Sequence, residues 1–160
     1  YVPADDFTDP AAAHIFSHLS ASVVLSRKRA SEGLYPAVDP LASASVMLTP
    51  AVVGQRHYDI ARAVRRTLAD YEDLRDIIAM LGLEELSSAD RATVARARRL
   101  ERFLTQPFFT TGSFSGMDGK LVPIADTIAG CETILAQTQF DLPESAYYMI
   151  GGLDDLKAKP

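Results

Sequence analysis

Residues 54–81 read GQRHYDIARAVRRTLADYEDLRDIIAML, and the spacing of side chains in this stretch decides the fold. One set of positions recurs at alternating intervals of four and three residues: Ile60, Val64, Thr67, Tyr71, Leu74, Ile78 and Leu81. These intervals place the side chains along one face of a helix, as a seam that packs against another helix. We therefore predict a long helix that ends at Gly82, because glycine suits the conformation that follows a last helical turn.

A second helix follows after a short link. Ser87, with Asp90 three residues later, resembles a capping box in which Asp replaces the usual Glu or Gln. Its apolar stripe comprises Val94, Ala97, Leu100 and Leu104. A link this short predicts an antiparallel helical hairpin, with the acidic segment Glu84-Glu-Leu-Ser-Ser-Ala-Asp90 at its tip.

Residues 35–50 are expected to form an extended connector, because they hold three prolines and several small side chains. We place a domain boundary there, with one domain at 1–48 and a second at 49–160. The predicted fold class is mainly α, with the hairpin inside a carboxyl-terminal helical bundle domain.

Further helices are expected on both sides of the hairpin. Asp9 is a suitable cap and Pro10 suits a first helical position, so a helix should run from there to about Glu32. Gly33 would stop it. Helices are also expected at 123–135 and 143–150, and the end of a strand followed by a polar loop at 1–8.

The composition excludes several classes of protein. A formal net charge of −5 and a pI near 5.1 argue against a nucleic-acid or anionic-membrane binder. No apolar run approaches the roughly 20 residues that span a bilayer. Cys131 is the single cysteine, which excludes an internal disulfide framework and favours a reducing compartment. The chain opens with Tyr1 rather than Met, and we interpret it as part of a longer subunit.

Aromatic side chains lie beside prolines in predicted irregular segments. Tyr35 opens the run Tyr35-Pro-Ala-Val-Asp-Pro40, Phe108 lies in Gln106-Pro-Phe-Phe109, and Phe114 follows shortly after. Rings on rigid loops suit stacking against a purine base. The same rings also fit a plain aromatic core at a domain junction, and spacing alone does not separate the two interpretations.

Other candidate motifs favour ordinary structural roles. Gly116-Met-Asp-Gly-Lys120 lacks the first glycine and the final Ser or Thr of a phosphate-binding loop, so it reads as a turn. His14 and His18 have the spacing of two metal ligands, but no third ligand lies nearby. Cys131 falls on an apolar helix face and reads as a core residue. We therefore predict neither a metal site nor a catalytic residue in this chain.

Charged residues of the hairpin and of the first loop also have ordinary explanations. The hairpin arginines alternate with acidic residues, which predicts a solvated, salt-bridged face. Asp9 is expected to cap a helix. The neighbouring Asp5, Asp6 and Thr8 suit either a solvated loop or a polar latch.

Taken together, the segments resemble the catalytic beta subunits of rotary ATP synthases, over essentially the whole chain. The matching runs are Tyr1-Val-Pro-Ala-Asp-Asp6, Thr8-Asp-Pro10, Val24-Leu-Ser-Arg27, Tyr35-Pro-Ala-Val-Asp-Pro-Leu41, His57-Tyr-Asp59, Asp76-Ile-Ile78, Arg102-Phe-Leu104, Gln106-Pro-Phe108 and Gly119-Lys-Leu-Val-Pro123. They correspond to about the carboxyl-terminal third of such a subunit. Residues 1–48 would then be the tail of a truncated α/β nucleotide-binding domain.

The resemblance implies roles for particular residues. Tyr35, Phe108 and Phe114 match the adenine pocket of the family, with Tyr35 stacking on the base. Contacts with the rotor are implied for the hairpin tip and for the loop near the amino terminus: Glu84, Glu85, Leu86, Asp90, Asp5, Asp6, Thr8 and Asp9.

The resemblance also implies an activity and partners. The family makes ATP from ADP and phosphate, or hydrolyses ATP in reverse, with rotation coupled to ion flow. Alpha subunits alternating in a hexameric ring, the gamma rotor stalk, ATP or ADP and Mg²⁺ would be its partners and cofactors. Localisation would be peripheral, at the cytoplasmic face of a bacterial inner membrane. The phosphate-binding loop, the Mg²⁺ ligand and the catalytic glutamate would lie upstream, so this piece alone is expected to be inactive.

Departures from the family pattern indicate a divergent branch of the family. Ser88 and Ala89 stand where the family tip is usually acidic, and residues 109–113 also differ from the usual sequence. We expect rotor contact to depend more on shape than on charge, and the coupling ion, proton or sodium, stays open. Two alternatives to a catalytic beta subunit stay open: a non-catalytic nucleotide-binding paralogue and a helical interaction module that binds no nucleotide.

Overall fold

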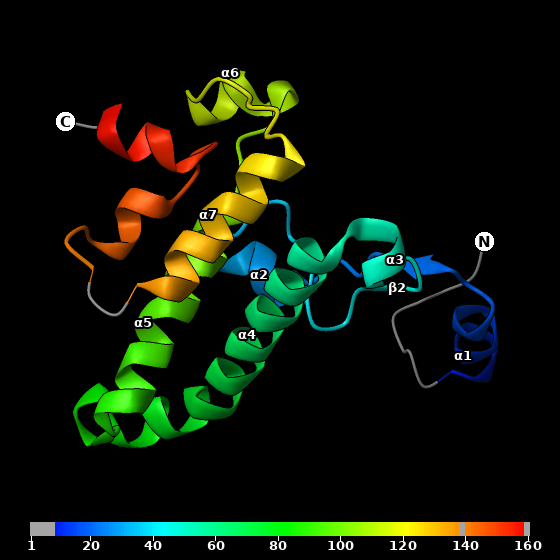
Figure 1. Cartoon of the computed structure of the whole chain (residues 1–160), viewed down its shortest axis with the longest axis horizontal. Helices are drawn as coiled ribbons and strands as arrows, with labels where there is room; N and C mark the ends of the chain where they lie inside the picture. The colour runs from blue at the N-terminus through cyan, green and yellow to red at the C-terminus, as the bar shows by residue number, and fades with distance from the viewer. Residues whose placement is uncertain (1–8, 138–139, 159–160) are drawn as a thin grey trace.

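The structure of this chain is a computed structural model that describes residues 9–137 and 140–158. Helices dominate the described part, and the strands β1 (Ala21–Ser22) and β2 (Ala44–Ser45) form a small antiparallel sheet. Figure 1 shows a body of packed helices from which the amino-terminal segment extends to one side. The mainly helical fold class is therefore confirmed.

The predicted hairpin is present. Helix α4 (Gln55–Leu81) ends at Gly82, where φ is +85°, and helix α5 (Ser88–Phe103) runs back beside it after the short 3-10 helix η1 (Leu83–Glu85). The Ser87 hydroxyl accepts a hydrogen bond from the Asp90 amide at 3.1 Å and donates one to the Asp90 carboxylate at 2.7 Å. The first bond is the predicted N-cap, but the Asp90 carboxylate bonds to the Ser87 hydroxyl and not to the Ser87 amide, so the second bond of a capping box is replaced by a side-chain contact.

A third helix, α7 (Ile124–Ala136), packs against both arms of the hairpin, as expected from the predicted helix at 123–135 (Figure 1). The side chains of Leu100 and Ile134 are completely buried between them. Leu68 and Phe103 also belong to this core, although the predicted stripes omitted both. Leu81, in contrast, was assigned to the seam and is exposed at the tip.

The helix predicted from Pro10 to Glu32 is wrong. Helix α1 (Pro10–Ser17) is followed by β1, which pairs with β2, and then by the short helix α2 (Arg27–Ser31). The intervening segment carries serines and the β-branched Val23 and Val24, which favour extended backbone when another strand is available. Asp9 does cap α1, because its carboxylate accepts the Ala11 amide at 2.8 Å.

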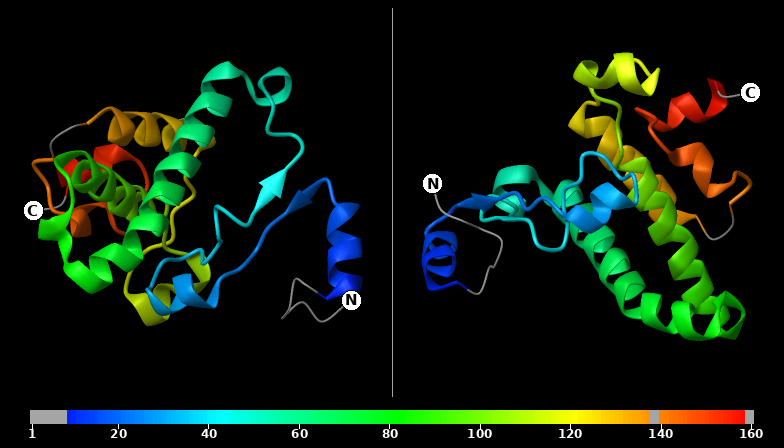
Figure 2. Two further views of the ribbon diagram at one scale, coloured as in Figure 1. Left: turned by 90° about the horizontal axis from the view of Figure 1, so that it is seen from below. Right: turned by 180° about the vertical axis from the view of Figure 1, so that it is seen from behind.

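The amino-terminal elements form an arm beside the helical body. Helix α3 (Pro50–Val53) leads from β2 into α4, and Figure 2 shows α1, the two strands and α3 extending away from α5 and α7. The strand expected at residues 1–8 lies outside the described residues. Among the described ones, no helix combines the length and the apolar composition that crossing a bilayer requires.

The carboxyl-terminal segment wraps back over α5 as short helices: η3 (Glu144–Tyr147) and η4 (Leu153–Ala158). The helix predicted at 143–150 is thus a shorter 3-10 helix, because Tyr148 is extended and Met149 has a φ of +53°. The Arg99 guanidinium of α5 lies 4.0 Å from the centre of the Phe140 ring and donates to the Leu142 carbonyl at 3.0 Å. Arg99 therefore holds this segment against the hairpin.

Candidate functional site

The segment that presents Tyr35 begins at the end of helix α2. Gly33 has a φ of +76°, and its amide donates to the Ala30 carbonyl at 3.1 Å, while the Leu34 amide donates to the Arg29 carbonyl at 2.9 Å. These two bonds form a Schellman motif, which needs the left-handed conformation that glycine adopts without strain. The predicted stop at Gly33 is confirmed, and it turns the chain toward Tyr35.

The backbone brings Tyr35 beside the segment that carries Phe108. The Tyr35 carbonyl accepts a hydrogen bond from the Gln106 amide at 2.9 Å. The side chain of Tyr35 is 41% exposed, and that of Phe108 is half-buried. Two of the three predicted pocket residues therefore lie on neighbouring segments with partly accessible rings.

Phe114 is placed differently. It lies on the short helix α6 (Gly112–Ser115), which follows the 3-10 helix η2 (Phe109–Thr111), and its side chain is 92% exposed. Within the described residues, the rings of Tyr35, Phe108 and Phe114 make no stacking contact with one another. Phe114 is thus available to a ligand or partner, but the fold of this chain does not by itself close a pocket around the three rings.

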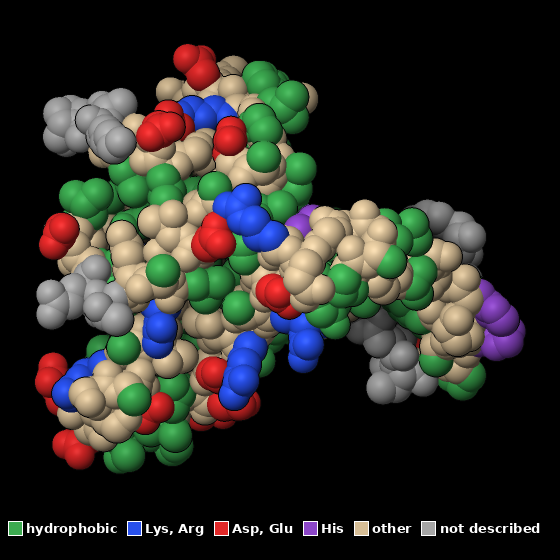
Figure 3. Space-filling view, viewed as in Figure 1, with side chains coloured by type: hydrophobic (Ala, Val, Ile, Leu, Met, Phe, Trp, Pro, Cys, Tyr) green, Lys and Arg blue, Asp and Glu red, His purple; other side chains and the backbone are tan. Residues whose placement is uncertain are grey.

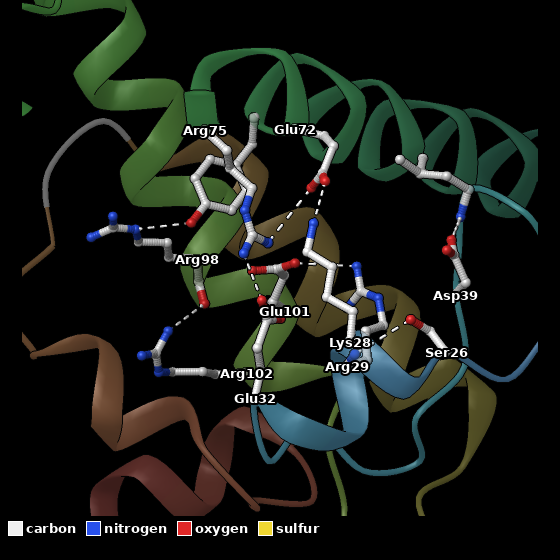
Figure 4. A network of polar contacts seen from close by, with 12 residues as sticks. Ser26, Lys28, Arg29, Glu32, Asp39, Glu72, Arg75, Arg98, Glu101 and Arg102 are labelled. Atoms are coloured by element: carbon white, nitrogen blue, oxygen red, sulfur yellow. Dashed lines mark hydrogen bonds and ion pairs between the residues drawn. The ribbon is translucent and has the colours of Figure 1, made fainter. Parts of the chain in front are cut away.

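Helix α2 is joined to the hairpin by ion pairs, shown in Figure 4. The Arg29 guanidinium lies 3.1 Å from the Glu101 carboxylate of α5. Two further pairs link α2 or its cap to α4: Lys28 with Glu72, and Glu32 with Arg75. The element that presents Tyr35 is therefore attached to both arms of the hairpin. The charge pattern predicted salt bridges within the hairpin, but spacing does not indicate these pairs, because their partners are distant in the chain.

Glu101 is the most unusual charge in this cluster. Its side chain is 9% exposed, and that of Arg29 is 16% exposed. Burial raises the pKa of Glu101 above its ordinary value, and the positive charges of Arg29 and Arg75 partly oppose this effect. A buried carboxylate of this kind depends on its partner, because an unpaired charge away from water is costly.

A cleft of about 480 Å³ adjoins the cluster, between α2, the hairpin and η3. Its lining carries charges of both signs, and they pair with one another: Arg98 and Arg102 both contact Glu144, and Arg98 also donates to the Tyr71 hydroxyl at 3.2 Å. The charges of this cleft therefore bind one another and hold η3 against α5.

The connector after Tyr35 is fixed on α4 by one side chain. The Arg65 guanidinium donates to the carbonyl oxygens of Pro40 and Ser43 at 2.7 Å and of Leu41 at 3.0 Å. The Asp39 carboxylate caps the turn by accepting the Leu41 amide at 2.8 Å. Because a guanidinium presents several donors in a fixed plane, Arg65 orders a segment that the sequence predicted only as extended.

The tip of the hairpin exposes both acidic and apolar side chains. Glu84 and Glu85 are exposed, and Asp90 is half-buried beside the N-cap of α5. Met80 and Leu81 are exposed next to them, and Figure 3 shows red and green side chains gathered over the bend, at the lower left.

The other predicted rotor-contact residues lie in different surroundings. Leu86 is only 7% exposed and packs into the core, so its side chain is not part of the tip surface. Asp9 is exposed at the start of α1, where it serves as the cap. Asp5, Asp6 and Thr8 lie outside the described residues.

No three His, Cys, Asp or Glu side chains come together as a possible metal site within the described residues. His14 and His18 form an edge-to-face pair with ring centres 4.8 Å apart. Cys131 is buried in the core, and burial raises the pKa of its thiol to about 12. Cys131 is therefore a structural residue, as the sequence predicted.

Two protein-family models together cover most of the chain. The model for the C-terminal domain of V and A type ATP synthase matches residues 47–138, more than half of the sequence. The model for the ATP synthase alpha/beta family, nucleotide-binding domain, matches residues 1–45. The chain belongs to the ATP synthase alpha/beta family.

Several similar proteins are ATP synthase beta subunits. The chain is 84% identical to ATP synthase subunit beta 1 of Dinoroseobacter shibae, over 98% of this chain and 34% of that protein. It is 82% identical to ATP synthase subunit beta 2 of Nitrosomonas eutropha, over 98% of this chain and 32% of that protein. The sequence thus matches the carboxyl-terminal region of beta subunits and spans about a third of the length of these relatives.

A solved structure shares the fold. It is the unique ATP synthase subunit NeqB from Nanoarcheaum equitans, with a TM-score of 0.70 at 24% identity, over 89% of this chain and 33% of that chain. At this identity the likeness concerns the fold, and it agrees with the helical body described above.

Proposed function

We propose that this chain forms the carboxyl-terminal part of a catalytic ATP synthase beta subunit, which makes ATP from ADP and phosphate and hydrolyses it in reverse. In this proposal the chain supplies part of the adenine pocket and the hairpin that pushes on the rotor. The boundary between the nucleotide-binding remnant at 1–48 and the helical domain at 49–160 would lie in the connector.

One observation carries the proposal for the base. The Gln106 amide donates a hydrogen bond to the Tyr35 carbonyl, and Gln106 lies two residues before Phe108. The partly accessible rings of Tyr35 and Phe108, which are distant in the sequence, therefore lie on adjoining segments. Phe114, which is almost fully exposed on α6, would be the third residue of the pocket. Stacking on one ring contributes about 1–3 kcal/mol, which is too little to hold a nucleotide without phosphate contacts from elsewhere.

The chemistry at the phosphates would come from other residues. The sequence contains no GxxxxGK[ST] loop, and the described residues hold no cluster of metal ligands. We therefore assign the Mg²⁺ that the family uses to residues outside this chain. The chain alone would therefore be inactive.

A mechanical path from the base to the rotor is part of the proposal. The ion pairs of Lys28, Arg29 and Glu32 attach α2 to the hairpin, and Arg65 attaches the connector to α4. Helix α4 has 27 residues and so extends about 40 Å at about 1.5 Å per residue. Movement of the base-binding segment would reach the tip through this lever.

The tip would contact the gamma stalk through Glu84, Glu85 and Asp90 beside the exposed Met80 and Leu81. Asp5, Asp6, Thr8 and Asp9 would form a second contact with the rotor. Alpha subunits would complete an alternating ring, and the complex would lie at the cytoplasmic face of a bacterial inner membrane.

Photolabelling of the full-length subunit with 2-azido-ADP tests the pocket. We expect the label on Tyr35 or Phe108, and we expect excess ADP to prevent it. Tyr35→Ala should weaken ADP binding about tenfold, while Tyr35→Phe keeps it, because stacking needs the ring. If no label is attached there, or if excess ADP does not prevent labelling, the result would support the helical interaction module that binds no nucleotide.

A second variant tests the lever. Ile78 packs against the core from α4, and Ile78→Asp places a charge in that seam. In the assembled complex it should uncouple ion pumping from ATP hydrolysis. Normal pumping by this variant would contradict the lever, and a full-length subunit that lacks the catalytic glutamate upstream of this region would favour the non-catalytic paralogue.

A further inference from the structure

Three segments that are distant in the sequence meet behind Tyr35. The Tyr148 hydroxyl donates a hydrogen bond to the Gly33 carbonyl at 2.8 Å. Gly33 lies two residues before Tyr35, and on the other side the Gln106 amide donates to the Tyr35 carbonyl at 2.9 Å. The backbone around Tyr35 is therefore held from the carboxyl-terminal segment and from the end of α5 at once.

The carboxyl-terminal segment is itself anchored at this junction. The Met149 amide donates to the Thr105 hydroxyl oxygen at 3.0 Å, and Thr105 in turn donates to the Arg102 carbonyl. Thr105 is buried, with 3% of its surface exposed. Thr105 thus joins residue 149 to the segment that bonds to Tyr35, and it fixes the position from which Tyr148 reaches Gly33.

Only the hydroxyl group of Tyr148 makes the bond to the Gly33 carbonyl. This carbonyl lies at the left-handed residue where the chain leaves α2, so its direction sets the path toward Tyr35. A hydrogen bond at such a turn restrains the peptide that precedes the ring, and it does so without touching the ring face. The Tyr35 ring stays accessible, while the backbone that leads to it is held in place.

We propose that Tyr148 is a positioning residue that presents Tyr35 for stacking on a purine base, with Thr105 as its anchor. This inference rests on the proposed function of Tyr35 and extends it to a carboxyl-terminal residue that touches no nucleotide. Loss of the hydroxyl lets the Tyr35 segment move, so affinity for the base falls while contacts to the phosphates are unchanged.

The test measures binding of two ligands to the full-length subunit by equilibrium dialysis. One is ADP with Mg²⁺, and the other is inorganic tripolyphosphate with Mg²⁺, which carries no base. Tyr148→Phe should weaken ADP binding about three- to tenfold, as expected for one neutral hydrogen bond, and leave tripolyphosphate binding unchanged. Tyr147→Phe is the matched control, because Tyr147 is the buried neighbour of Tyr148, and it should change neither constant.

A second pair of variants covers the case in which Tyr148→Phe fails to fold. Thr105→Val removes the acceptor for the Met149 amide and should give the same selective loss for ADP, whereas Thr105→Ser keeps the hydroxyl and should restore it. Unchanged ADP binding in Tyr148→Phe overturns the inference, and so does an equal loss for both ligands. If Tyr35→Ala also leaves ADP binding unchanged, the base pocket itself is wrong; if it weakens binding, only the role of Tyr148 fails.

Discussion

Arg29 of α2 and Glu101 of α5 form an ion pair across 3.1 Å, and both side chains are largely withdrawn from water. The two residues lie 72 positions apart, so this contact joins the amino-terminal part of the chain to the middle of the hairpin. Removal of one partner from such a pair leaves a charge that is neither hydrated nor neutralised. The pair therefore links stability to the attachment of the segment that carries Tyr35.

Arg29→Met should destabilise the chain by about 3 kcal/mol at pH 7, because Glu101 then stays buried without its partner. Urea unfolding followed by circular dichroism measures this loss. The matched control is Arg56→Met, which breaks the exposed pair of Arg56 with Glu132 and should change stability little. Equal effects of the two substitutions would contradict the importance of burial.

The same carboxyl should make stability depend on pH in a defined direction. Burial raises the pKa of Glu101 above its ordinary value of 4.5, so the folded chain holds this proton more tightly than the unfolded chain. The contribution is fully present below pH 4.5 and is lost as the pH rises through the raised value. Unfolding of the parent and of Glu101→Gln from pH 4 to 8 should show the parent losing stability relative to the variant, and a constant difference would contradict this.

Gly130 of α7 marks a close crossing with Phe103 of α5. A Cβ atom at Gly130 would lie 2.1 Å from the Phe103 Cζ. Although alanine favours helices over glycine, Gly130→Ala should lower the unfolding free energy by about 2 kcal/mol through overpacking. Gly152→Ala, where nothing lies within 4 Å, is the control. In a double-mutant cycle Phe103→Leu should recover much of the loss, and additive effects would contradict the clash.

Cys131 should be unreactive in the folded chain. Burial raises the pKa of its thiol to about 12, so almost no thiolate is present at pH 8. As the single cysteine it gives a clean signal, and its reaction with DTNB should be slow until urea unfolds the chain. Rapid reaction under native conditions would show that α7 opens locally at that site.

The hairpin could be predicted because its causes are local. The seam through Val64 and Tyr71, the glycine after Leu81 and the Ser87–Asp90 cap each lie within a few turns of helix, where spacing translates directly into geometry. The first helix was overestimated because the pairing of Ala21–Ser22 with Ala44–Ser45 depends on a partner more than twenty residues away. Local preference does not contain that information.

The candidate site, too, could be predicted only in part from the sequence. Tyr35 and Phe108 stand out in the sequence because they lie beside prolines on irregular segments, and Phe114 follows shortly after Phe108. Their order along the chain indicates nothing about which of them become neighbours. The bond from Gln106 to Tyr35, and the exposure of Phe114, required the folded chain.

By itself the amino-acid sequence determined the helical hairpin, its caps, the buried role of Cys131 and the aromatic segments, since periodicity and capping act over one or two helical turns. Tertiary structure alone decided that α2 attaches through Arg29 to Glu101, that Arg65 holds the connector and that Tyr148 reaches Gly33. These contacts join residues separated by 22 to 115 positions. Such contacts depend on the packing of the apolar seams, which brings these segments together.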